Sequence, residues 1–172
     1  MTLTARRLAV FLVAVGLLTA WAAFVRAEEA DPAALAKALK RTTVTLQDGL
    51  KTSEREGKPI SGKFEIEDGA LQLSVYSLKG NDFIEVVVDP KSGAVAKAEE
   101  LTDAIDLNDA AAQKAAMTKA KVTLLAATGT AVKANPGFQA VSIYPQLQNG
   151  DAVAEVTLLQ GTTFKKVTEK LD

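Results

Sequence analysis

Acidic side chains gather in two short stretches that could bind a cation or transfer a proton. Glu65 and Glu67 alternate along a predicted strand, which places both on one face, and Asp68 follows directly. Such a trio is compatible with a calcium site or with acid–base chemistry. Because Phe64 and Ile66 alternate with these carboxylates, we expect instead a solvated strand face opposite an apolar one.

The second acidic stretch comprises Asp106, Asn108 and Asp109, whose oxygens have the close spacing of a calcium loop. Neither a glycine nor a later glutamate follows at EF-hand spacing, so capping of the next helix explains these residues. The other candidates are serines next to lysines, strand tyrosines and a basic stretch, which we interpret as turn, packing and solvated helix residues. They are Lys51 with Ser53, Lys91 with Ser92, Tyr76, Tyr144, and Lys114 with Lys119 and Lys121.

The composition removes most catalytic chemistries. The 172 residues include no cysteine and no histidine, which excludes Ser-His-Asp and Cys-His catalysis, Cys/His zinc sites and disulfides. The phosphate-binding patterns GxGxxG and GxxxxGK[ST] do not occur. A formal net charge of −1 and 5% aromatic residues are untypical of nucleic-acid binders. We therefore predict a non-enzymatic protein without catalytic, cofactor-binding or metal-binding residues, without a cofactor and without a nucleic-acid partner.

Residues 1–27 have the pattern of a secretory signal. Arg6 and Arg7 precede an uninterrupted apolar or small run over residues 8–25, and Val25-Arg26-Ala27 places small residues at the −3 and −1 positions of a cleavage site. The run is also long enough for an uncleaved membrane anchor, and this alternative stays open. Cleavage removes three of the 20 basic residues, which leaves 17 against 21 acidic ones, or −4. We expect export to the periplasm or the medium by general secretion, with membrane contact only if the segment is retained.

The chain after the signal contains an internal repeat. An offset of 78 residues aligns Val44-Thr45-Leu46 with Val122-Thr123-Leu124. Further along, an offset of 81 aligns a V-x-x-L-x-G-x-x-F-x-x-V pattern, which implies a three-residue insertion in the second copy. The matching residues are Val75, Leu78, Gly80, Phe83 and Val86, which recur as Val156, Leu159, Gly161, Phe164 and Val167. We predict two units, residues 28–100 and 109–172, joined by a linker over 101–108.

Each unit is predicted to contain two helices followed by antiparallel strands. Helices are expected to begin where a capping residue precedes an apolar helical period. These positions are Asp31-Pro32, Thr45 with Asp48, Asn108 or Asp109, and Thr123. Alternating apolar residues predict strands with hairpin turns at Asp68-Gly69 and Asn149-Gly150. The predicted class is α+β, in which the helices of each unit cover the apolar face of a three- or four-stranded sheet. Whether the two sheets join cannot be read from these patterns.

The first unit, over about residues 43–98, resembles a PepSY domain. The similarity runs through Val44-Thr45-Leu46, the acidic strand at 60–67, residues 73–76, and residues 83–95 with the turn Asp89-Pro90-Lys91-Ser92-Gly93. The second unit resembles a degenerate copy, because it lacks that turn and most acidic strand residues. Tandem units of two helices on a sheet are also similar in architecture to secreted β-lactamase-inhibitory proteins, an analogy of fold alone.

This resemblance implies a function in the bacterial envelope. PepSY domains are extracytoplasmic modules of metallopeptidase propeptides and envelope proteins, so the expected role is to bind or restrain a peptidase or another extracytoplasmic protein. The resemblance implies no cofactor and no substrate. Two alternatives remain open at this point: a carrier of small apolar ligands held between the helices and the sheet, and a purely structural envelope module.

Overall fold

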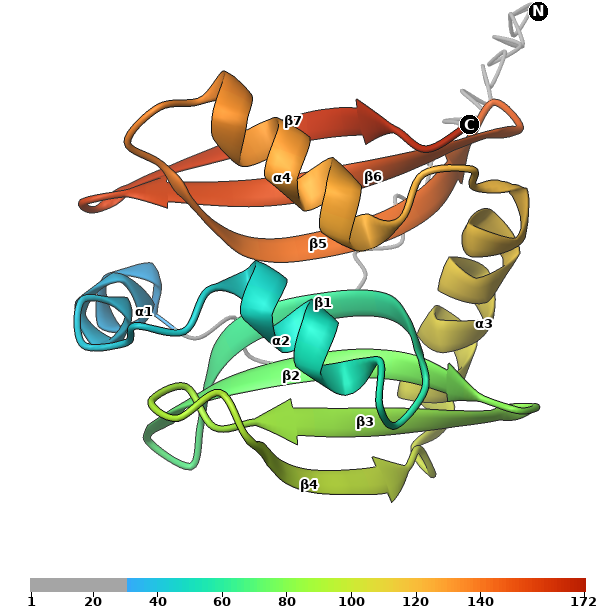
Figure 1. Ribbon diagram of the computed structural model, residues 1–172, viewed down its shortest axis with the longest axis horizontal. Coiled ribbons are helices and arrows are strands. Elements are labelled where there is room, and N and C mark those ends of the chain that lie inside the picture. Colours follow the sequence, from blue (N-terminus) through green and yellow to red (C-terminus); the bar gives the residue numbers. More distant parts are fainter. Residues whose placement is uncertain (1–30) are drawn as a thin grey trace, which may run out of the picture.

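The structure, a computed structural model, describes residues 31–172, and the predicted signal segment lies outside this range (Figure 1). Within it the chain forms four helices and seven strands. The first half contains α1 (Pro32–Leu39), α2 (Leu46–Ser53), β1 (Lys58–Glu67), β2 (Ala70–Lys79), β3 (Asp82–Val88) and β4 (Val95–Glu100). The second half contains α3 (Ala104–Lys119), α4 (Leu124–Ala134), β5 (Gln139–Gln148), β6 (Asp151–Gln160) and β7 (Thr163–Lys170). The fold class is α+β, as predicted.

All seven strands form one antiparallel sheet in the order β4-β3-β2-β1-β5-β6-β7. The halves of the chain meet where β1 pairs with β5, and there Gly62 lies opposite Ile143. Strands β5, β6 and β7 begin at residues 139, 151 and 163, which is 81 residues after β1, β2 and β3 at 58, 70 and 82. The sequence left open whether the two sheets join, and the structure shows that they are continuous, with β4 and β7 at the two edges (Figure 1).

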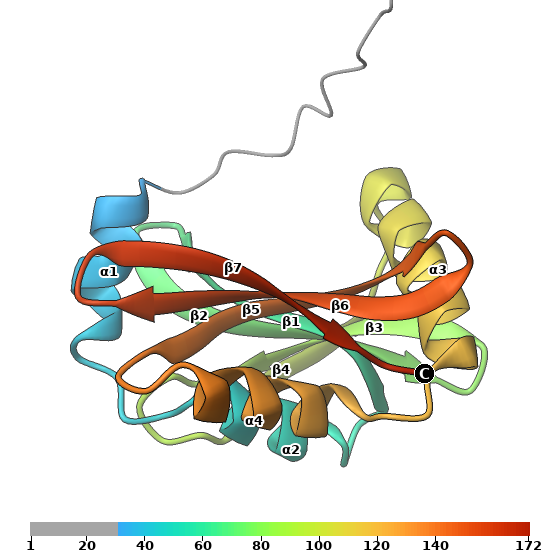
Figure 2. The ribbon, with the colours of Figure 1, turned by 90° about the horizontal axis from the view of Figure 1, so that it is seen from above.

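The helices divide into two pairs. Helices α2 and α4 lie next to each other on one face of the sheet, whereas α1 and α3 stand at its opposite ends and project toward the other side (Figure 2). We expected all the helices to cover the apolar face, and for α1 and α3 this expectation is wrong. The reason is their small apolar surface, because α1 buries only Ala36 and Leu39, and α3 buries Ala110, Ala116 and Met117.

The hydrophobic core lies between the sheet and the α2–α4 pair. Fully buried aliphatic side chains from both halves fill this space, and each contributes roughly 1.5–3 kcal/mol relative to an exposed position. They include Leu46, Leu50, Ile60, Leu73, Val75, Ile143, Val156 and Leu158. The same core thus holds both halves together.

Three of the predicted helix starts are confirmed by their caps. The Asp31 carboxylate accepts a hydrogen bond from the Ala33 amide, and Pro32 occupies the first turn of α1. Thr45 and Asp48 form a complete capping box at α2. The Thr123 hydroxyl accepts a hydrogen bond from the amide of Ala126 at the start of α4.

The two predicted hairpin turns are also present. Asp68 and Gly69 have φ values of 50° and 77°, and Asn149 and Gly150 have values of 53° and 93°. Two successive residues with positive φ define the tight turn whose twist matches the flanking strands, and Asn-Gly and Asp-Gly are the sequences that best tolerate it. These turns fix the registers of β1–β2 and β5–β6.

The predicted linker over residues 101–108 is wrong in its second part. Helix α3 begins at Ala104, not after Asn108 or Asp109, because the Asp103 side chain accepts hydrogen bonds from the amides of Ile105 and Asp106. An earlier cap therefore starts the helix one turn sooner. Only residues 101–103 remain as the connection between β4 and α3.

Candidate functional site

The sheet face opposite α2 and α4, which we call the open face, is not covered by these two helices (Figure 2). Helices α1 and α3 border it at its two ends (Figure 2). On the α3 side, the Ser61 hydroxyl donates a hydrogen bond of 2.6 Å to the side chain of Gln113, and the Lys114 ammonium lies 5.6 Å from the centre of the Phe83 ring. These two contacts hold α3 against strands β1 and β3.

Strand register organises the open face into two neighbouring rows that run across the sheet. The first, the tyrosine row, carries carboxylates and tyrosines: Glu99, Glu85, Tyr76, Ser61, Tyr144, Glu155 and Thr168. The second, the lysine row, carries lysines and hydroxyls: Lys97, Val87, Ser74, Lys63, Ser142, Thr157 and Lys166. Cross-strand neighbours of this kind lie about 5 Å apart, so each row is a continuous ladder of side chains.

Each lysine of the lysine row has a carboxylate partner. The ammonium of Lys97 lies 2.7 Å from Glu99, that of Lys63 lies 2.5 Å from Glu65, and that of Lys166 lies 2.8 Å from Glu155. The outer pairs are largely exposed and contribute little to stability, whereas Lys63 and Glu65 are mostly buried. The ammonium group of each of these lysines is therefore already paired with a glutamate on the same face.

Lys63 and Tyr76 form the centre of the open face. The Lys63 ammonium lies 5.8 Å from the centre of the Tyr76 ring, within the range of a cation–π contact. Burial alone lowers the pKa of Lys63. The neighbouring Tyr144, Glu65 and Glu85 outweigh this effect and raise the pKa, so the side chain is charged throughout the neutral range.

The phenol of Tyr76 remains protonated in the same environment. Burial contributes most to raising its pKa above the usual value, and the negative charges of Glu85, Glu65 and Asp106 raise it further. Its hydroxyl is thus available as a hydrogen-bond donor at any physiological pH. Both tyrosines are half-buried and lie opposite cross-strand neighbours, as expected for residues that pack between strands.

Two carboxylates near Tyr76 lack an ion-pair partner. No lysine or arginine among residues 31–172 lies within ion-pair distance of Glu85 or Asp106. The pKa of Asp106 is raised, first by burial and then by the charge of Asp103, although Lys63 acts in the opposite direction. The part of the open face around Tyr76 therefore carries excess negative charge.

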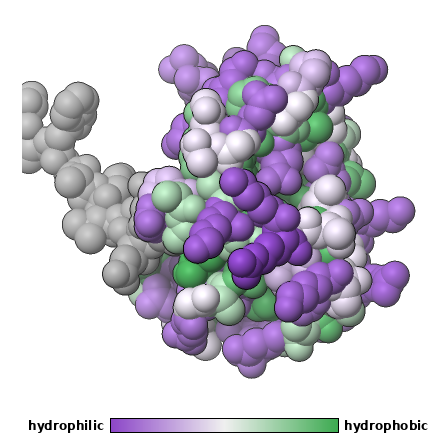
Figure 3. Space-filling view, turned by 90° about the vertical axis from the view of Figure 1, so that its left-hand side faces the viewer, coloured by the Kyte–Doolittle hydropathy of each residue, from purple (hydrophilic) through white to green (hydrophobic). Residues whose placement is uncertain are grey.

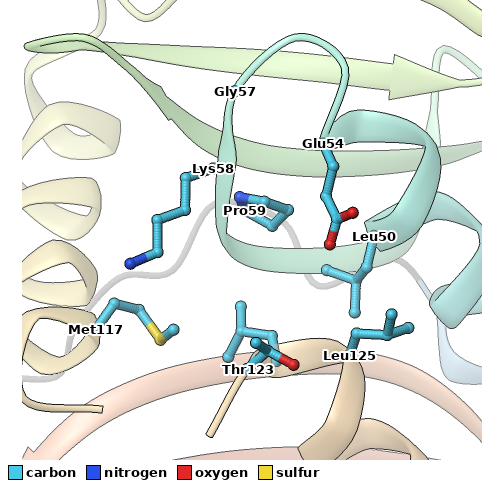
Figure 4. Close-up of a pocket in the computed structure, with 9 residues that line it drawn as sticks. Leu50, Glu54, Gly57, Lys58, Pro59, Met117, Thr123 and Leu125 are labelled. Atoms are coloured by element: carbon cyan, nitrogen blue, oxygen red, sulfur yellow. The ribbon is translucent and has the colours of Figure 1, made fainter. Parts of the chain in front are cut away.

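A separate cleft lies on the other side of the molecule, where the end of α2 and the start of α4 meet (Figure 4). Its volume is about 320 Å³, and apolar side chains line much of it. Lys58 and Glu54 stand at its rim, as Figure 4 shows. The apolar lining consists of Leu50, Pro59, Met117, Leu124 and Leu125.

The acidic residues singled out in the sequence do not form a metal centre. Within residues 31–172, no group of three or more acidic side chains is arranged to hold a metal ion. Glu65 is paired with Lys63, and Glu67 and Asp68 lie exposed at the β1–β2 turn. Asp106, Asn108 and Asp109 lie within α3 and not in a loop.

The serine and lysine candidates have structural roles. The Ser53 hydroxyl donates to the carbonyl of Leu50, and the Ser92 hydroxyl donates to Asp89 in the β3–β4 turn. The ammonium of Lys119 donates to the Gly150 carbonyl, which ties α3 to the β5–β6 hairpin. Sequence reasoning missed Glu85 and Glu155, because their position beside the tyrosines depends on the register between strands.

Broad apolar surfaces are scarce. Figure 3 shows the end of the molecule that carries α1, where hydrophilic side chains alternate with small hydrophobic patches. Among residues 31–172 the exposed large hydrophobic side chains are Ile105 and Leu147, which are 68% and 43% exposed. Ile105 projects from the same helical turn as Asp106. The edge strands β4 and β7 both carry exposed charged residues, a pattern that disfavours pairing with other strands.

No protein-family model matches the chain, and no curated protein matches it. A crystal structure from Clostridium difficile 630, described there as a candidate lipoprotein, superimposes with a TM-score of 0.40 and 16% sequence identity, over 76% of this chain and 88% of that one. Among the described helices, none has the length and apolar character needed to cross a bilayer.

Proposed function

We propose that this protein is an exported, non-catalytic module that binds another extracytoplasmic protein, such as a peptidase, through its open face. The observation that supports this function is the tyrosine row. It presents two half-buried tyrosines between carboxylates on a face that α2 and α4 leave uncovered. Tyrosines provide much contact area at low cost in side-chain entropy, and they are enriched at protein interfaces.

The repeat and its PepSY-like character belong to the same proposal. The equal 81-residue spacing of three strand starts, together with the pairing of Gly62 with Ile143, favours a duplicated unit. The difference between these two residue numbers, 143 − 62 = 81, equals the offset of the sequence repeat. Each copy would then use its first strand to join the other, and the shared sheet provides one broad face.

Site-specific photo-crosslinking in the native envelope tests the binding surface. A photo-reactive residue in place of Thr168 reports on the open face, and the same residue in place of Lys133, an exposed position on α4, is the matched control. We expect one defined protein adduct from position 168 and none from position 133. Equal adducts from both positions, or none from position 168 with the protein correctly exported, would contradict the proposal.

The cleft between α2 and α4 favours a second candidate function, the carriage of a small apolar ligand. The expected ligand location between the helices and the sheet is filled by Leu46, Leu50 and Ile143. The volume of the cleft, by contrast, lies at the low end of the range that is typical of small-molecule sites. Native mass spectrometry of the exported protein tests this candidate. A bound mass that disappears in Met117→Trp would support it, and a protein that carries no small molecule would exclude it.

Export itself is tested by the intact mass of the protein. Cleavage after Ala27 removes 27 residues, so the mature chain is expected to begin at Glu28. A full-length mass in the membrane fraction would instead identify the anchor alternative.

A further inference from the structure

The three lysines of the lysine row account for the negative charge of Glu99, Glu65 and Glu155, and two carboxylates remain. These are Glu85, which is the cross-strand neighbour of Tyr76, and Asp106, which reaches the same place from α3. The other lysine on this side, Lys114, lies against the Phe83 ring, and these two carboxylates without an ion-pair partner lie at one position of the open face. That position is next to the aromatic ring and not at an exposed turn, where excess charge would be screened by solvent.

We propose that the open face binds a basic segment of its partner protein, with a lysine or arginine side chain placed between Glu85 and Asp106 beside the ring of Tyr76. This inference rests on the proposed function and adds the chemistry of the partner. The Tyr76 ring offers a flat surface for the guanidinium or ammonium group, and the two carboxylates accept its hydrogen bonds.

Several features of the site fit a cation better than an anion or a neutral group. The carboxyl of Asp106 and the phenol of Tyr76 both respond to surrounding negative charge, so an incoming cation is favoured by more than one neighbour. Lys63 offsets part of this negative charge, because it interacts with both Glu85 and Asp106, but its ammonium is in direct contact with Glu65.

An anionic partner would need the opposite arrangement. On the β5–β7 part of the open face Lys166 is paired with Glu155, and the exposed Lys170 lies at the end of the strand. The half formed by β1, β2 and β3 is therefore the part that determines the partner's charge.

The direct test uses two short blocked peptides that differ in charge alone, one alternating threonine with arginine and one alternating threonine with glutamine. Binding to the mature protein is followed by NMR chemical shifts at low ionic strength. We expect the arginine peptide to shift the amide signals of Tyr76, Glu85 and Asp106, and the glutamine peptide to leave them unchanged. Equal shifts from both peptides would overturn the inference.

A matched pair of variants separates a local effect from an effect of net charge. The double variant Glu85→Gln/Asp106→Asn removes two charges from the site, and Glu54→Gln/Glu56→Gln removes two from the α2 side of the molecule. We expect the first to weaken binding of the arginine peptide by about tenfold or more and the second to have less than half that effect. An equal loss in both variants would show nonspecific attraction and contradict the inference.

The inference about the partner's charge and the proposal that the open face binds a partner can be tested separately. If the crosslink from position 168 persists in the Glu85→Gln/Asp106→Asn variant with unchanged yield, the basic-segment inference is wrong and the open face remains the binding surface. If the crosslink is absent from the unmodified protein, the proposed function itself is wrong.

Discussion

Gly62 lies opposite Ile143 at the centre of the sheet, and this pair joins the two halves of the chain. A Cβ atom at Gly62 would lie 3.4 Å from the side chains of both Leu46 and Leu50, an ordinary contact distance, so α2 packs directly over this position of the central strand. Because the two residues are also separated by the repeat offset, a local two-fold axis between them would relate the halves. The open face follows from this arrangement, since α2 and α4 are then placed on the same side.

Substitution of Gly49 in α2 and of Gly129 in α4 tests how closely each helix packs against its neighbours. In Gly49→Ala the new Cβ would lie 2.4 Å from a terminal carbon of Leu73, which is fully buried. We expect this overpacking to exceed the gain in helix propensity and to lower the free energy of unfolding by about 1–3 kcal/mol. Urea denaturation measures the change.

Gly129→Ala in α4 is the matched control, because nothing lies within 4 Å of the added Cβ. Here only the helix propensity changes, and the free energy of unfolding should rise by about 0.5–1 kcal/mol. If Gly49→Ala were as stabilising as Gly129→Ala, the close contact between α2 and β2 would be wrong.

Ser77 is a buried side chain with an unsatisfied hydroxyl. It is fully buried on β2, and its oxygen has no hydrogen-bond partner among the described residues. An unsatisfied buried polar group costs about 1–3 kcal/mol, so Ser77→Ala is expected to leave stability unchanged or to increase it. Ser61→Ala, which removes the hydrogen bond to Gln113, is expected to lower the melting temperature. A loss in Ser77→Ala similar to that in Ser61→Ala would indicate that the Ser77 hydroxyl is satisfied.

Asp106 is expected to make stability depend on pH in a recognisable way. Its folded-state pKa is raised by burial and by Asp103, so its ionisation is less favourable in the folded protein than in the unfolded chain. The resulting loss of stability is absent below the unfolded pKa of about 3.9 and complete above the folded value. Asp106→Asn should therefore stabilise the protein at neutral pH and have little effect near pH 3. Stabilisation that is equal at both pH values would contradict this explanation.

Asp48 should show the opposite dependence and is a useful comparison. Hydrogen bonds from the Thr45 hydroxyl and amide lower the pKa of Asp48 in the folded protein. The stability that it contributes is present above the unfolded pKa of about 3.9 and is lost as the pH falls through the lower folded value. Asp48→Asn is expected to destabilise the protein at neutral pH, with a difference that shrinks in acid. Thermal unfolding as a function of pH measures both variants, and the same sign for both would contradict the two assignments.

Local elements were predictable where side chains act on their own backbone. The Thr45–Asp48 capping box, the Asp-Gly and Asn-Gly turns and the alternation around Phe64 depend on residues close in sequence, and all are present. The start of α3 was missed because Asp103 competes with Asn108 and Asp109 as a cap, and sequence spacing alone does not decide between them.

The candidate site was not predictable from the sequence, since it is assembled by long-range register. Tyr76 and Tyr144 come together only because β1 pairs with both β2 and β5, and no local pattern encodes the β1–β5 pairing. Glu85 gains its importance in the same way, through its pairing with Tyr76. An odd shift in any of these registers would move the tyrosines to the helix-covered face.

The affinity of the double variant Tyr76→Ala/Tyr144→Ala for the crosslinked partner tests the central claim most directly. Leu125→Ala/Lys133→Ala, on the opposite side of the molecule, is the control, and the melting temperature of each variant shows that it is folded. We predict that the tyrosine variant binds the partner at least about tenfold more weakly, because interface tyrosines commonly contribute a large share of binding energy, while the control binds normally. Unchanged affinity in a folded tyrosine variant would contradict the assignment of the open face as the binding surface.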